Sequence, residues 1–345
     1  MSNQPVNTPA LIIGAGPAGL FAVFELGMLG ISAHVLDVLP RAGGQCMELY
    51  PDKPIFDIPA HPRITGRELT ERLLAQARPF QPVFHFGETA QALEPVAQDE
   101  GGGFLVSTAS GKRFQAKVVI VAAGGGAIVP KRPPLKNLAE FEEKSVFYAV
   151  REPERFAGRR IVVVGGGDSA LDWAIELAPK AERLTLLHRR EQFRAAPASV
   201  ERMRAMVNAG EMDFRLGQIS ALVGEEGRLR AVQARHQGET FSIDADVCLM
   251  FFGLAGRLGA LEKWGYEVRG GRIVVNAESF ETTIPGVFAI GDVCDYPGKL
   301  KLILSGFHEA ALMARKAAQY VFPGRHIAFE HSTSSAIIAE RMGNQ

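Results

Sequence analysis

Short apolar runs, a glycine turn and a helical pattern follow one another near the start of the chain. Residues 10–13 and 33–36 are apolar runs that favour buried parallel strands, and residues 20–29 between them have a helical pattern. The first run leads into Gly14-Ala15-Gly16-Pro17-Ala18-Gly19, and the second ends at Asp37. In a dinucleotide-binding fold the first glycine makes the turn, the second lets backbone N–H groups reach a pyrophosphate, and the third lets helix and strand pack closely. We therefore expect Gly14, Gly16 and Gly19 to hold a dinucleotide and Asp37 to bind its ribose; a merely structural glycine turn is the alternative.

The same order of elements recurs in the middle of the chain. Residues 161–164 form an apolar run, the turn reads Gly165-Gly166-Gly167-Asp168-Ser169-Ala170, and a helix to about residue 178 precedes a strand at 184–187. His188 stands as far after Gly165 as Asp37 stands after Gly14, so a histidine replaces the acid. Alanine is tolerated at the third position of this fingerprint. Gly165, Gly167, Asp168 and Ser169 are therefore expected to border a second dinucleotide.

Basic residues gather directly after this second unit. They are His188, Arg189, Arg190 and Arg194. No carboxylate is placed here for a free 2′-hydroxyl, whereas guanidinium groups are always charged and grip phosphate bidentately. The second site is thus predicted to bind NADPH, and a solvated charge run at a strand end is the alternative. One acidic and one basic nucleotide site together indicate hydride exchange between a flavin and NADPH.

The remaining patterns predict how the chain divides. Strands are expected at 104–108, 112–117 and 118–121, short strands and turns over 214–246, a buried strand with a Gly-Asp turn over 283–292, and a helix over 304–320. The fold class is therefore α/β with two Rossmann-like domains. The predicted parts are an FAD-binding domain at 1–125, an NADPH-binding domain at 126–284, a return segment at 285–325 and a tail at 326–345.

The composition of the chain argues against several classes of function. Lys plus Arg equals Asp plus Glu at 38 each, so a net charge of zero offers no footprint for nucleic acid or an anionic membrane. The three cysteines, Cys46, Cys248 and Cys294, suit a reducing compartment and form no metal cluster with histidine. The first nine residues lack Lys and Arg, which disfavours a signal peptide. The apolar stretch 11–33 is broken by glycines, so we expect no membrane span and a cytoplasmic protein.

Several motifs together resemble the flavoprotein reductases that have two dinucleotide domains. They are GAGPAG, VVVGGGDSA, HRR with a following FRA, and PGVFAIGD. The thioredoxin reductase branch has a CxxC dithiol before its second glycine motif, but residues 148–154 here contain no cysteine. The chain instead resembles the thioredoxin-reductase-like (type 2) ferredoxin–NADP⁺ reductases over nearly all its length, through GGQ (43–45), TGREL (65–69), GDVCDYPGKLKLI (291–303) and HSTS (331–334). That resemblance implies a homodimer with FAD bound in each subunit.

The resemblance also implies individual roles in the FAD site. Gln45 and Tyr50 would contact FAD, with Tyr50 stacked on the isoalloxazine and His331 covering its other face. Asp292 would bind the ribityl chain and Thr333 would contact FAD from the tail, near the partner subunit. The remaining expected contacts are Ala90 at the adenine and Ile128 at the flavin. A loop tyrosine, a helix cap and a solvent-exposed tail histidine are the respective alternatives for Tyr50, Asp292 and His331.

The predicted activity is electron transfer between NADPH, through FAD, and ferredoxin or flavodoxin. Without a dithiol, a one-electron carrier is the natural outlet, because a flavin accepts two electrons together and releases them singly. One alternative is an NADPH-dependent flavin reductase of quinone, oxygen or a low-molecular disulfide, with Cys46 and Cys294 as a redox pair. The other is a non-catalytic flavin sensor. Lys131, Arg132 and Lys136 are candidates for docking an acidic carrier, or else an ordinary solvated loop.

Overall fold

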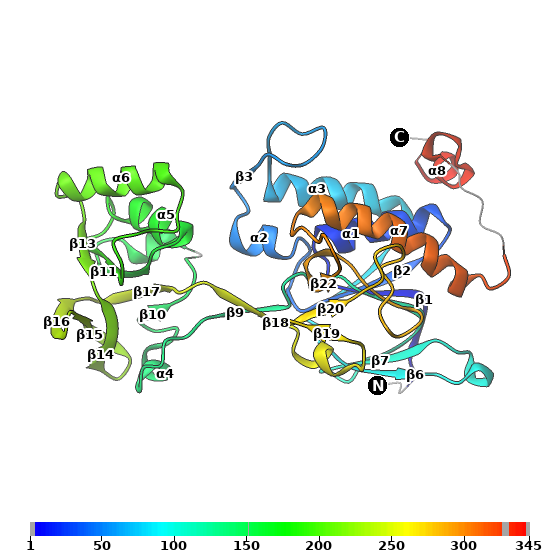
Figure 1. The fold of residues 1–345 in the computed structure, drawn as a ribbon, viewed down its shortest axis with the longest axis horizontal. Coiled ribbons are helices and arrows are strands. Elements are labelled where there is room, and N and C mark those ends of the chain that lie inside the picture. Colours follow the sequence, from blue (N-terminus) through cyan, green and yellow to red (C-terminus); the bar gives the residue numbers. More distant parts are fainter. Residues whose placement is uncertain (1–3, 151, 326–330, 343–345) are drawn as a thin grey trace. The chain divides into compact units, whose positions relative to one another are not determined.

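The computed structural model describes residues 4–150, 152–325 and 331–342 of the chain (Figure 1). They form two compact units. The discontinuous unit comprises Met1–Ala127 and Gly256–Gln345, and the inserted unit comprises Ile128–Ala255. The chain passes between them through β9 (Ala127–Pro130) and β18 (Leu254–Arg257), which pair with each other.

The discontinuous unit is built on a seven-stranded sheet with a mainly parallel centre. The order is β5-β2-β1-β8-β7-β6, and β21 pairs with β8. All pairings are parallel except those of β6 with β7 and β7 with β8. The strands are β1 (Val6–Ile13), β2 (Ala33–Asp37), β5 (Val83–Phe86), β6 (Ala90–Pro95), β7 (Phe104–Thr108), β8 (Arg113–Val121) and β21 (Val287–Ala289).

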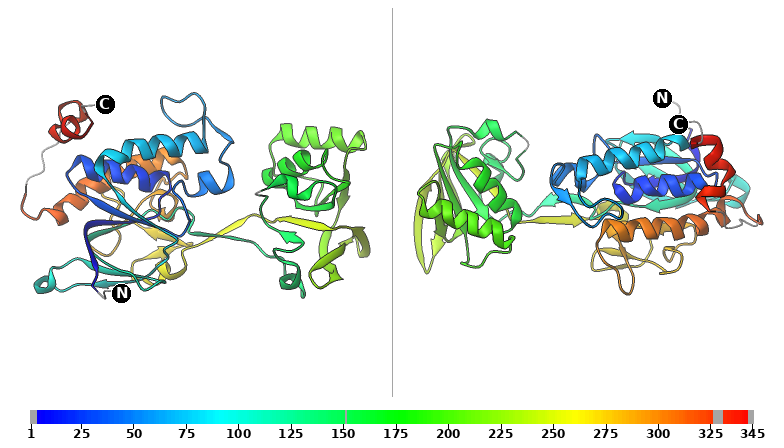
Figure 2. Two further views of the ribbon diagram at one scale, coloured as in Figure 1. Left: turned by 180° about the vertical axis from the view of Figure 1, so that it is seen from behind. Right: turned by 90° about the horizontal axis from the view of Figure 1, so that it is seen from above.

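Three helices cover this sheet. They are α1 (Pro17–Met28), α3 (Gly66–Ala77) and α7 (Ile303–Val321), and α1 contacts the other two (Figure 2). The centre of β1, Ala10 to Ile12, is fully buried, as expected for a strand covered on both faces. The shorter elements of this unit are α2 (Gln45–Leu49), β3 (Pro54–Ile55), β4 (Ile64–Thr65), η1 (Arg78–Phe80), η2 (Gln98–Glu100), η4 (Gly259–Lys263), β19 (Val268–Arg269), β20 (Arg272–Val274), η5 (Gly291–Val293), β22 (Cys294–Asp295), η6 (Ser332–Ser334) and α8 (Ala336–Met342).

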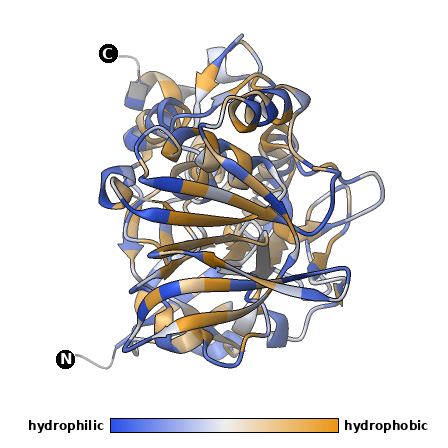
Figure 3. Ribbon diagram, turned by 90° about the vertical axis from the view of Figure 1, so that its left-hand side faces the viewer, coloured by the Kyte–Doolittle hydropathy of each residue, from blue (hydrophilic) through white to orange (hydrophobic). Residues whose placement is uncertain are grey.

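The inserted unit repeats the design with a smaller parallel sheet in the order β10-β17-β11-β12-β13. Along β11, Ile161 and Val163 pack with the helices, whereas Val162 and Val164 pack with a three-stranded antiparallel sheet. This small sheet has the order β14-β15-β16. Along its strands the hydropathy changes repeatedly from residue to residue, because one face of the sheet is buried (Figure 3). The elements are α4 (Leu138–Phe141), β10 (Val146–Phe147), η3 (Pro153–Phe156), β11 (Arg160–Gly165), α5 (Asp168–Leu177), β12 (Arg183–His188), α6 (Pro197–Asn208), β13 (Asp213–Leu216), β14 (Gln218–Glu225), β15 (Arg228–His236), β16 (Glu239–Asp244) and β17 (Val247–Phe251).

The sequence-based expectations differ from the structure in a few places. The two strands expected at 112–117 and 118–121 are one strand, β8, because the segment that pairs with β7 continues without a break into the sheet centre. The strand expected around 283–290 covers only Val287–Ala289. The tail contains a helix, α8, that the sequence pattern did not predict.

The division of the chain also differs from the expected boundaries. The chain returns to the discontinuous unit at Gly256, not at residue 285. The reason is that Leu261, Trp264, Ile273 and Phe280 are buried in the core of the discontinuous unit, and the Trp264 indole donates to the Gln91 carbonyl at 3.2 Å. Within the described residues no helix is both long and apolar enough to span a bilayer.

Candidate functional site

The first glycine turn is held in place by contacts that exclude side chains. Gly14 has a φ of +114°, and a Cβ atom there would lie 2.3 Å from the Ala122 carbonyl oxygen at the end of β8. A Cβ atom at Gly19 would lie 1.9 Å from the Gly14 oxygen. The Gly14 amide donates to Leu36 at 2.8 Å, which links the turn to β2. These contacts assign Gly14 and Gly19 to the turn and its packing, as the spacing predicts.

Gly16 borders open space. It is the N-cap of α1, no side chain caps this helix, and Pro17 occupies the first turn. The nearest atom to a Cβ at Gly16 would be Gly44 Cα, at 3.9 Å. Backbone N–H groups at a helix N-terminus with no side chain over them form an anion-binding site. The glycine turn and the N-terminus of α1 form an open site, called a glycine cradle below, that fits the pyrophosphate of a dinucleotide.

Asp37 ties the turn to the end of β2. Asp37 is 7% exposed, and its carboxylate accepts the amides of Ala15 at 2.6 Å and Leu39 at 2.8 Å. Burial raises the pKa of this carboxyl, and the two amide bonds act in the opposite direction. A carboxylate has about four acceptor positions, so capacity remains for ribose hydroxyls. The backbone of Glu88 donates to the Asp37 carbonyl at 2.9 Å, which brings the start of β6, and so Ala90, to this end of the sheet.

Three further predicted FAD contacts gather at the glycine-rich end of β8. Gln45 Nε2 would lie 3.0 Å from a Cβ at Gly125. The Tyr50 hydroxyl lies 3.7 Å from Cys46 Sγ. Burial raises the pKa of Tyr50, and the nearby Asp292 carboxylate raises it further. Gln45 and Tyr50 belong to one short segment at α2, whereas Asp292 follows far later in the sequence, and the fold brings the two segments together.

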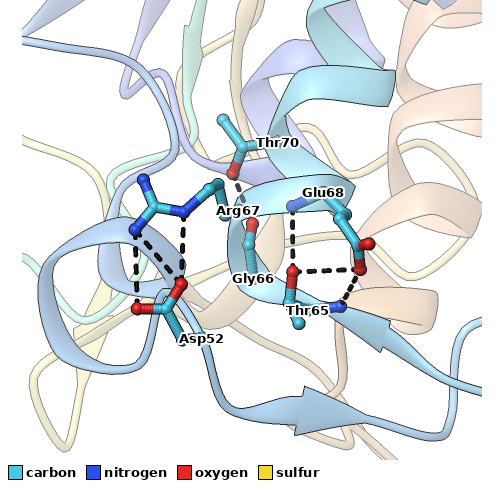
Figure 4. Close-up of polar contacts among 6 residues, drawn as sticks. All are labelled: Asp52, Thr65, Gly66, Arg67, Glu68 and Thr70. Atoms are coloured by element: carbon cyan, nitrogen blue, oxygen red, sulfur yellow. Dashed lines mark hydrogen bonds and ion pairs between the residues drawn. The ribbon is translucent and has the colours of Figure 1, made fainter.

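The first turn of α3 fixes the segment that carries Tyr50 (Figure 4). Thr65 and Glu68 form a capping box, in which the Glu68 amide donates to Thr65 Oγ1 at 3.2 Å and the Thr65 amide donates to Glu68 Oε2 at 2.9 Å. A Cβ atom at Gly66 would lie 3.0 Å from the Tyr50 carbonyl oxygen, so α3 can approach this backbone only with glycine there. Arg67 donates through its amide to Pro51 at 2.9 Å and through its guanidinium to Asp52. The TGREL motif therefore positions the Tyr50 loop.

The tail residues are not brought to this site within the same chain. His331 and Thr333 are exposed and lie just before α8. That helix packs at the far end of α1 from the glycine turn: Ile337 would lie 3.6 Å from a Cβ at Gly30, and Arg341 donates to Pro79 at 3.4 Å. Twelve helical residues separate the two ends of α1 by about 18 Å. The side chain of Ile128 lies outside the described residues.

The second glycine turn has the same construction. Gly165 has a φ of +157°, and a Cβ atom there would lie 2.7 Å from the Phe251 carbonyl oxygen. A Cβ at Gly167, the N-cap of α5, would meet nothing within 4 Å. Asp168 and Ser169 are exposed in the first turn of α5, and Asp168 accepts the Ala196 amide at 2.9 Å. This cradle, too, is open to a phosphate group.

The basic residues beside it divide into two kinds. His188 turns inward, stacks on Phe193 with ring centroids 5.1 Å apart, and has a pKa lowered by burial. Arg189 and Arg190 are exposed at the end of β12. The Arg194 amide donates to Gly166 at 2.8 Å, which places this exposed residue beside the glycine turn. The fixed positive charge of the site therefore comes from the arginines.

All three cysteines are buried and unpaired. Burial raises the pKa of each thiol, and the Glu309 carboxylate adds to the effect at Cys294. Cys46 contacts Tyr50, whereas Cys294 contacts Gly291 and Glu309. Such thiols are poor nucleophiles.

The sequence-based reasoning missed one functional candidate, Glu309. It interrupts the apolar stripe of α7 formed by Gly306, Ala310, Met313 and Ala317. The available signal was an acidic residue at a position where the helical spacing predicts burial. A buried carboxylate needs polar partners, so such a residue indicates a built polar cluster.

Comparison with known proteins identifies the class. Residues 8–317 match the pyridine nucleotide-disulphide oxidoreductase family, and the chain belongs to it. The chain is 53% identical over 340 residues to a ferredoxin–NADP reductase of Beijerinckia indica and 52% identical over 342 residues to one of Nitrobacter winogradskyi, with 99% of both chains covered in each alignment. These relatives confirm the resemblance inferred from the motifs.

Solved structures show the same fold at lower identity. Thioredoxin reductase of T. acidophilum superimposes with a TM-score of 0.72 at 24% identity, covering 91% of this chain and 98% of that one. The bacillithiol disulfide reductase of Staphylococcus aureus superimposes with a TM-score of 0.74 at 18% identity, covering 90% and 98%. The predicted α/β architecture with two dinucleotide-binding domains is confirmed.

Proposed function

We propose that this protein is a ferredoxin–NADP⁺ reductase, a flavoprotein that moves electrons between NADPH and ferredoxin or flavodoxin by way of FAD. The observation that carries the proposal is the pair of open glycine cradles, one bordered by Asp37 and the other by Arg189, Arg190 and Arg194. Full-length relatives that carry this name support it. Two intact cradles argue against a non-catalytic flavin sensor.

The discontinuous unit would hold FAD. Gly14, Gly16 and Gly19 present α1 to the pyrophosphate, and Asp37 accepts the ribose hydroxyls. Ala90 borders the adenine, Gln45 and Ile128 border the ring system, and Asp292 takes the ribityl chain. Tyr50 covers one face of the ring system and excludes water from it. Bound FAD supplies the ability to take up a hydride and to give electrons one at a time.

The inserted unit would hold NADPH. Gly165, Gly167, Asp168 and Ser169 border its pyrophosphate, and the arginines hold the 2′-phosphate. The neutral ring of His188 lies over the glycine turn and helps to shape the site. Hydride transfer requires no acid or base from the protein, so these residues bind and orient the nicotinamide donor.

The outlet for electrons is a one-electron carrier. An internal dithiol is disfavoured because the thiols are buried, protonated and engaged with different partners. The same observation disfavours Cys46 and Cys294 as a redox pair for a low-molecular disulfide.

We propose further that two copies of the chain assemble in the cytoplasm as a homodimer. Because α8 packs at the end of α1 remote from the glycine turn, His331 and Thr333 would reach the flavin of the partner subunit and not their own. His331 would then cover the ring face opposite Tyr50.

The test is anaerobic reduction of the FAD-loaded protein by NADPH, followed by addition of ferredoxin, flavodoxin, thioredoxin or a quinone. Bleaching of the flavin by NADPH and fast reoxidation by ferredoxin or flavodoxin are expected. Absence of bleaching would favour the sensor, and faster reoxidation by quinone or thioredoxin would favour another reductase. Sedimentation of the FAD-loaded protein measures the oligomeric state.

A further inference from the structure

Four groups converge on one carboxylate inside the discontinuous unit. Glu309 on α7 is fully buried. It accepts the Gly291 amide at 2.6 Å and the Tyr296 hydroxyl at 2.9 Å, and the Cys294 thiol lies 3.5 Å from it. The Lys299 ammonium pairs with the same carboxylate, and its side chain is 2% exposed. All four partners belong to residues 291–299, so one helical residue gathers this whole segment.

The backbone that Glu309 holds is the turn before Asp292. Gly291 has a φ of +82°, and a Cβ atom there would lie 3.3 Å from Ala18 Cβ in the first turn of α1. Gly291 therefore lies beside the first turn of α1 and directly before Asp292. Glu309 accepts the amide on one side of Gly291, and the Cys294 thiol lies 3.1 Å from the Gly291 carbonyl oxygen on the other side. The peptide groups on both sides of Gly291 are therefore held, which fixes the backbone from which the Asp292 side chain extends.

The buried hydrogen bonds and the ion pair of Glu309 restrict the movement of this cluster. Water does not reach Glu309, so each bond it loses leaves a buried polar group unsatisfied. The Lys299 ammonium supplies the counter-charge that a buried carboxylate requires. The arrangement thus tolerates little movement of the 291–299 segment.

We propose that Glu309 is a positioning residue for the FAD site, which it shapes by fixing the Gly291–Asp292 turn, with Lys299 as its counter-ion. This inference rests on the proposed role of Asp292 in holding FAD. Glu309 itself does not contact the cofactor; it acts through Asp292.

The test compares two variants that differ only in the acceptor at position 309. Both carry Lys299→Met, so that neither leaves a buried charge unpaired, and apolar groups of similar volume are tolerated in place of such pairs. Glu309→Gln with Lys299→Met keeps an oxygen for the Gly291 amide, whereas Glu309→Met with Lys299→Met removes it. The readout is the Kd for FAD, measured on the full-length apoprotein by quenching of flavin fluorescence.

The glutamine variant is expected to bind FAD within about threefold of wild type. The methionine variant should bind FAD about tenfold or more weakly, because the buried Gly291 amide then has no acceptor. When Asp292→Ala is added to both, the difference between them should fall below about threefold, because neighbours in one network are not additive. Equal affinity of the two variants would overturn the proposal, and so would a difference that persists with Asp292→Ala.

A matched control is available at Glu281. Its carboxylate accepts the Gly286 amide at 2.8 Å and bonds to the Tyr320 hydroxyl, but it flanks no predicted FAD contact. Glu281→Met should lower the melting temperature of the apoprotein and leave the Kd for FAD unchanged. A loss of FAD affinity as large as that of the Glu309 variant would mean that any lost anchor has this effect, and would overturn the positioning role. Failure of the wild type to reduce ferredoxin would refute the proposed function and leave this comparison intact.

Discussion

The imidazole ring of His188 occupies the space that a side chain at Gly166 would need: a Cβ atom built on Gly166 would lie 2.3 Å from His188 Nε2. Glycine is therefore required at position 166 by the neighbouring His188 ring. Because burial lowers the pKa of His188, this ring is neutral at physiological pH and contributes no fixed charge. In the proposed NADPH site, the charge that distinguishes NADPH from NADH would therefore come from the exposed arginines next to this ring.

Removal of Arg189 and Arg190 should weaken the binding of NADPH far more than the binding of NADH. Each charge-assisted hydrogen bond to a phosphate contributes roughly 1.5–3 kcal/mol, so Arg189→Ala with Arg190→Ala should raise KM for NADPH by one to several orders of magnitude. Steady-state reduction of a dye with each nucleotide measures the ratio. His188→Ala, which removes no fixed charge, is the control and should change both KM values alike. An unchanged NADPH/NADH ratio in the double variant would refute the assignment of the 2′-phosphate site.

Ferredoxin-linked activity should not need a cysteine. Cys46→Ser with Cys248→Ala and Cys294→Ser removes all three thiols, which are buried and protonated. Turnover from NADPH to ferredoxin is expected to stay within about threefold of wild type, with stability reduced by about 1 kcal/mol for each core position. In the wild-type protein, the number of titratable thiols should be the same before and after reduction by NADPH. Loss of turnover with FAD still bound would favour a thiol mechanism.

Docking of an acidic carrier should depend on the loop after β9. Lys131, Arg132 and Lys136 are exposed there, although Arg132 already pairs with Glu142 at 3.0 Å. Lys131→Glu with Arg132→Glu should slow the association of ferredoxin at low salt, since rim charges act mainly on association rate. Reduction of a small dye should be unaffected. The same charge change at Lys180 and Arg183, which form exposed ion pairs elsewhere on the inserted unit, is the control. If dye reduction falls as well, the loop serves folding or nucleotide binding; if ferredoxin reduction is unchanged, the carrier docks elsewhere.

A histidine pair should make the discontinuous unit sensitive to acid. His34 Nδ1 and His85 Nε2 lie 3.0 Å apart on β2 and β5, a bond that needs one unprotonated nitrogen. Burial lowers the pKa of both rings, and the charges of His34 and Lys112 lower that of His85 further while Glu88 opposes them. The unfolded chain therefore binds more protons below about pH 6.5, so the free energy of unfolding decreases as the pH falls through this range.

His85→Phe removes one partner and should flatten this dependence between pH 6.5 and 5. Phe114 already packs against this ring, with centroids 4.9 Å apart, so an apolar ring is compatible with the site. Denaturant titrations at several pH values measure the slope. A variant that loses stability with acid as steeply as wild type would show that other groups carry the effect.

The sequence predicted the glycine turns well because each rule there is local. Gly14, Asp37 and Gly165 follow from spacing within one strand–turn–helix unit, although Gly14 and Gly165 also pack against Ala122 and Phe251 from more distant strands. The return of the chain at Gly256 was not predictable in this way, because it depends on which core buries Trp264 and Phe280. Glu309 depends on the meeting of α7 with a segment folded against α1, which periodicity along one helix does not reveal. The position of the His188 ring was not predictable from spacing, because it depends on packing against Phe193 and on the space left by Gly166; its contact with the nucleotide stays a prediction.

The discontinuous unit can be completed only late in synthesis, because it is made from the first and the last segments of the chain. The inserted unit is one continuous stretch, Ile128–Ala255, and is therefore complete before the last part of the discontinuous unit has been made. The sheet of the discontinuous unit must wait, because β21 pairs with β8 and α7 covers α1 only after the last third of the chain has been made. Until then residues 119–121 of β8 lack the strand that pairs with them, although β7 already pairs with residues 113–116, and the segment that contains Asp292 has not yet been made. Because the proposed FAD site needs both parts of the divided unit, we expect the flavin to be captured late in biogenesis. A ribosome stalled before residue 287 would carry the complete inserted unit beside a sheet with an open edge at residues 119–121 of β8.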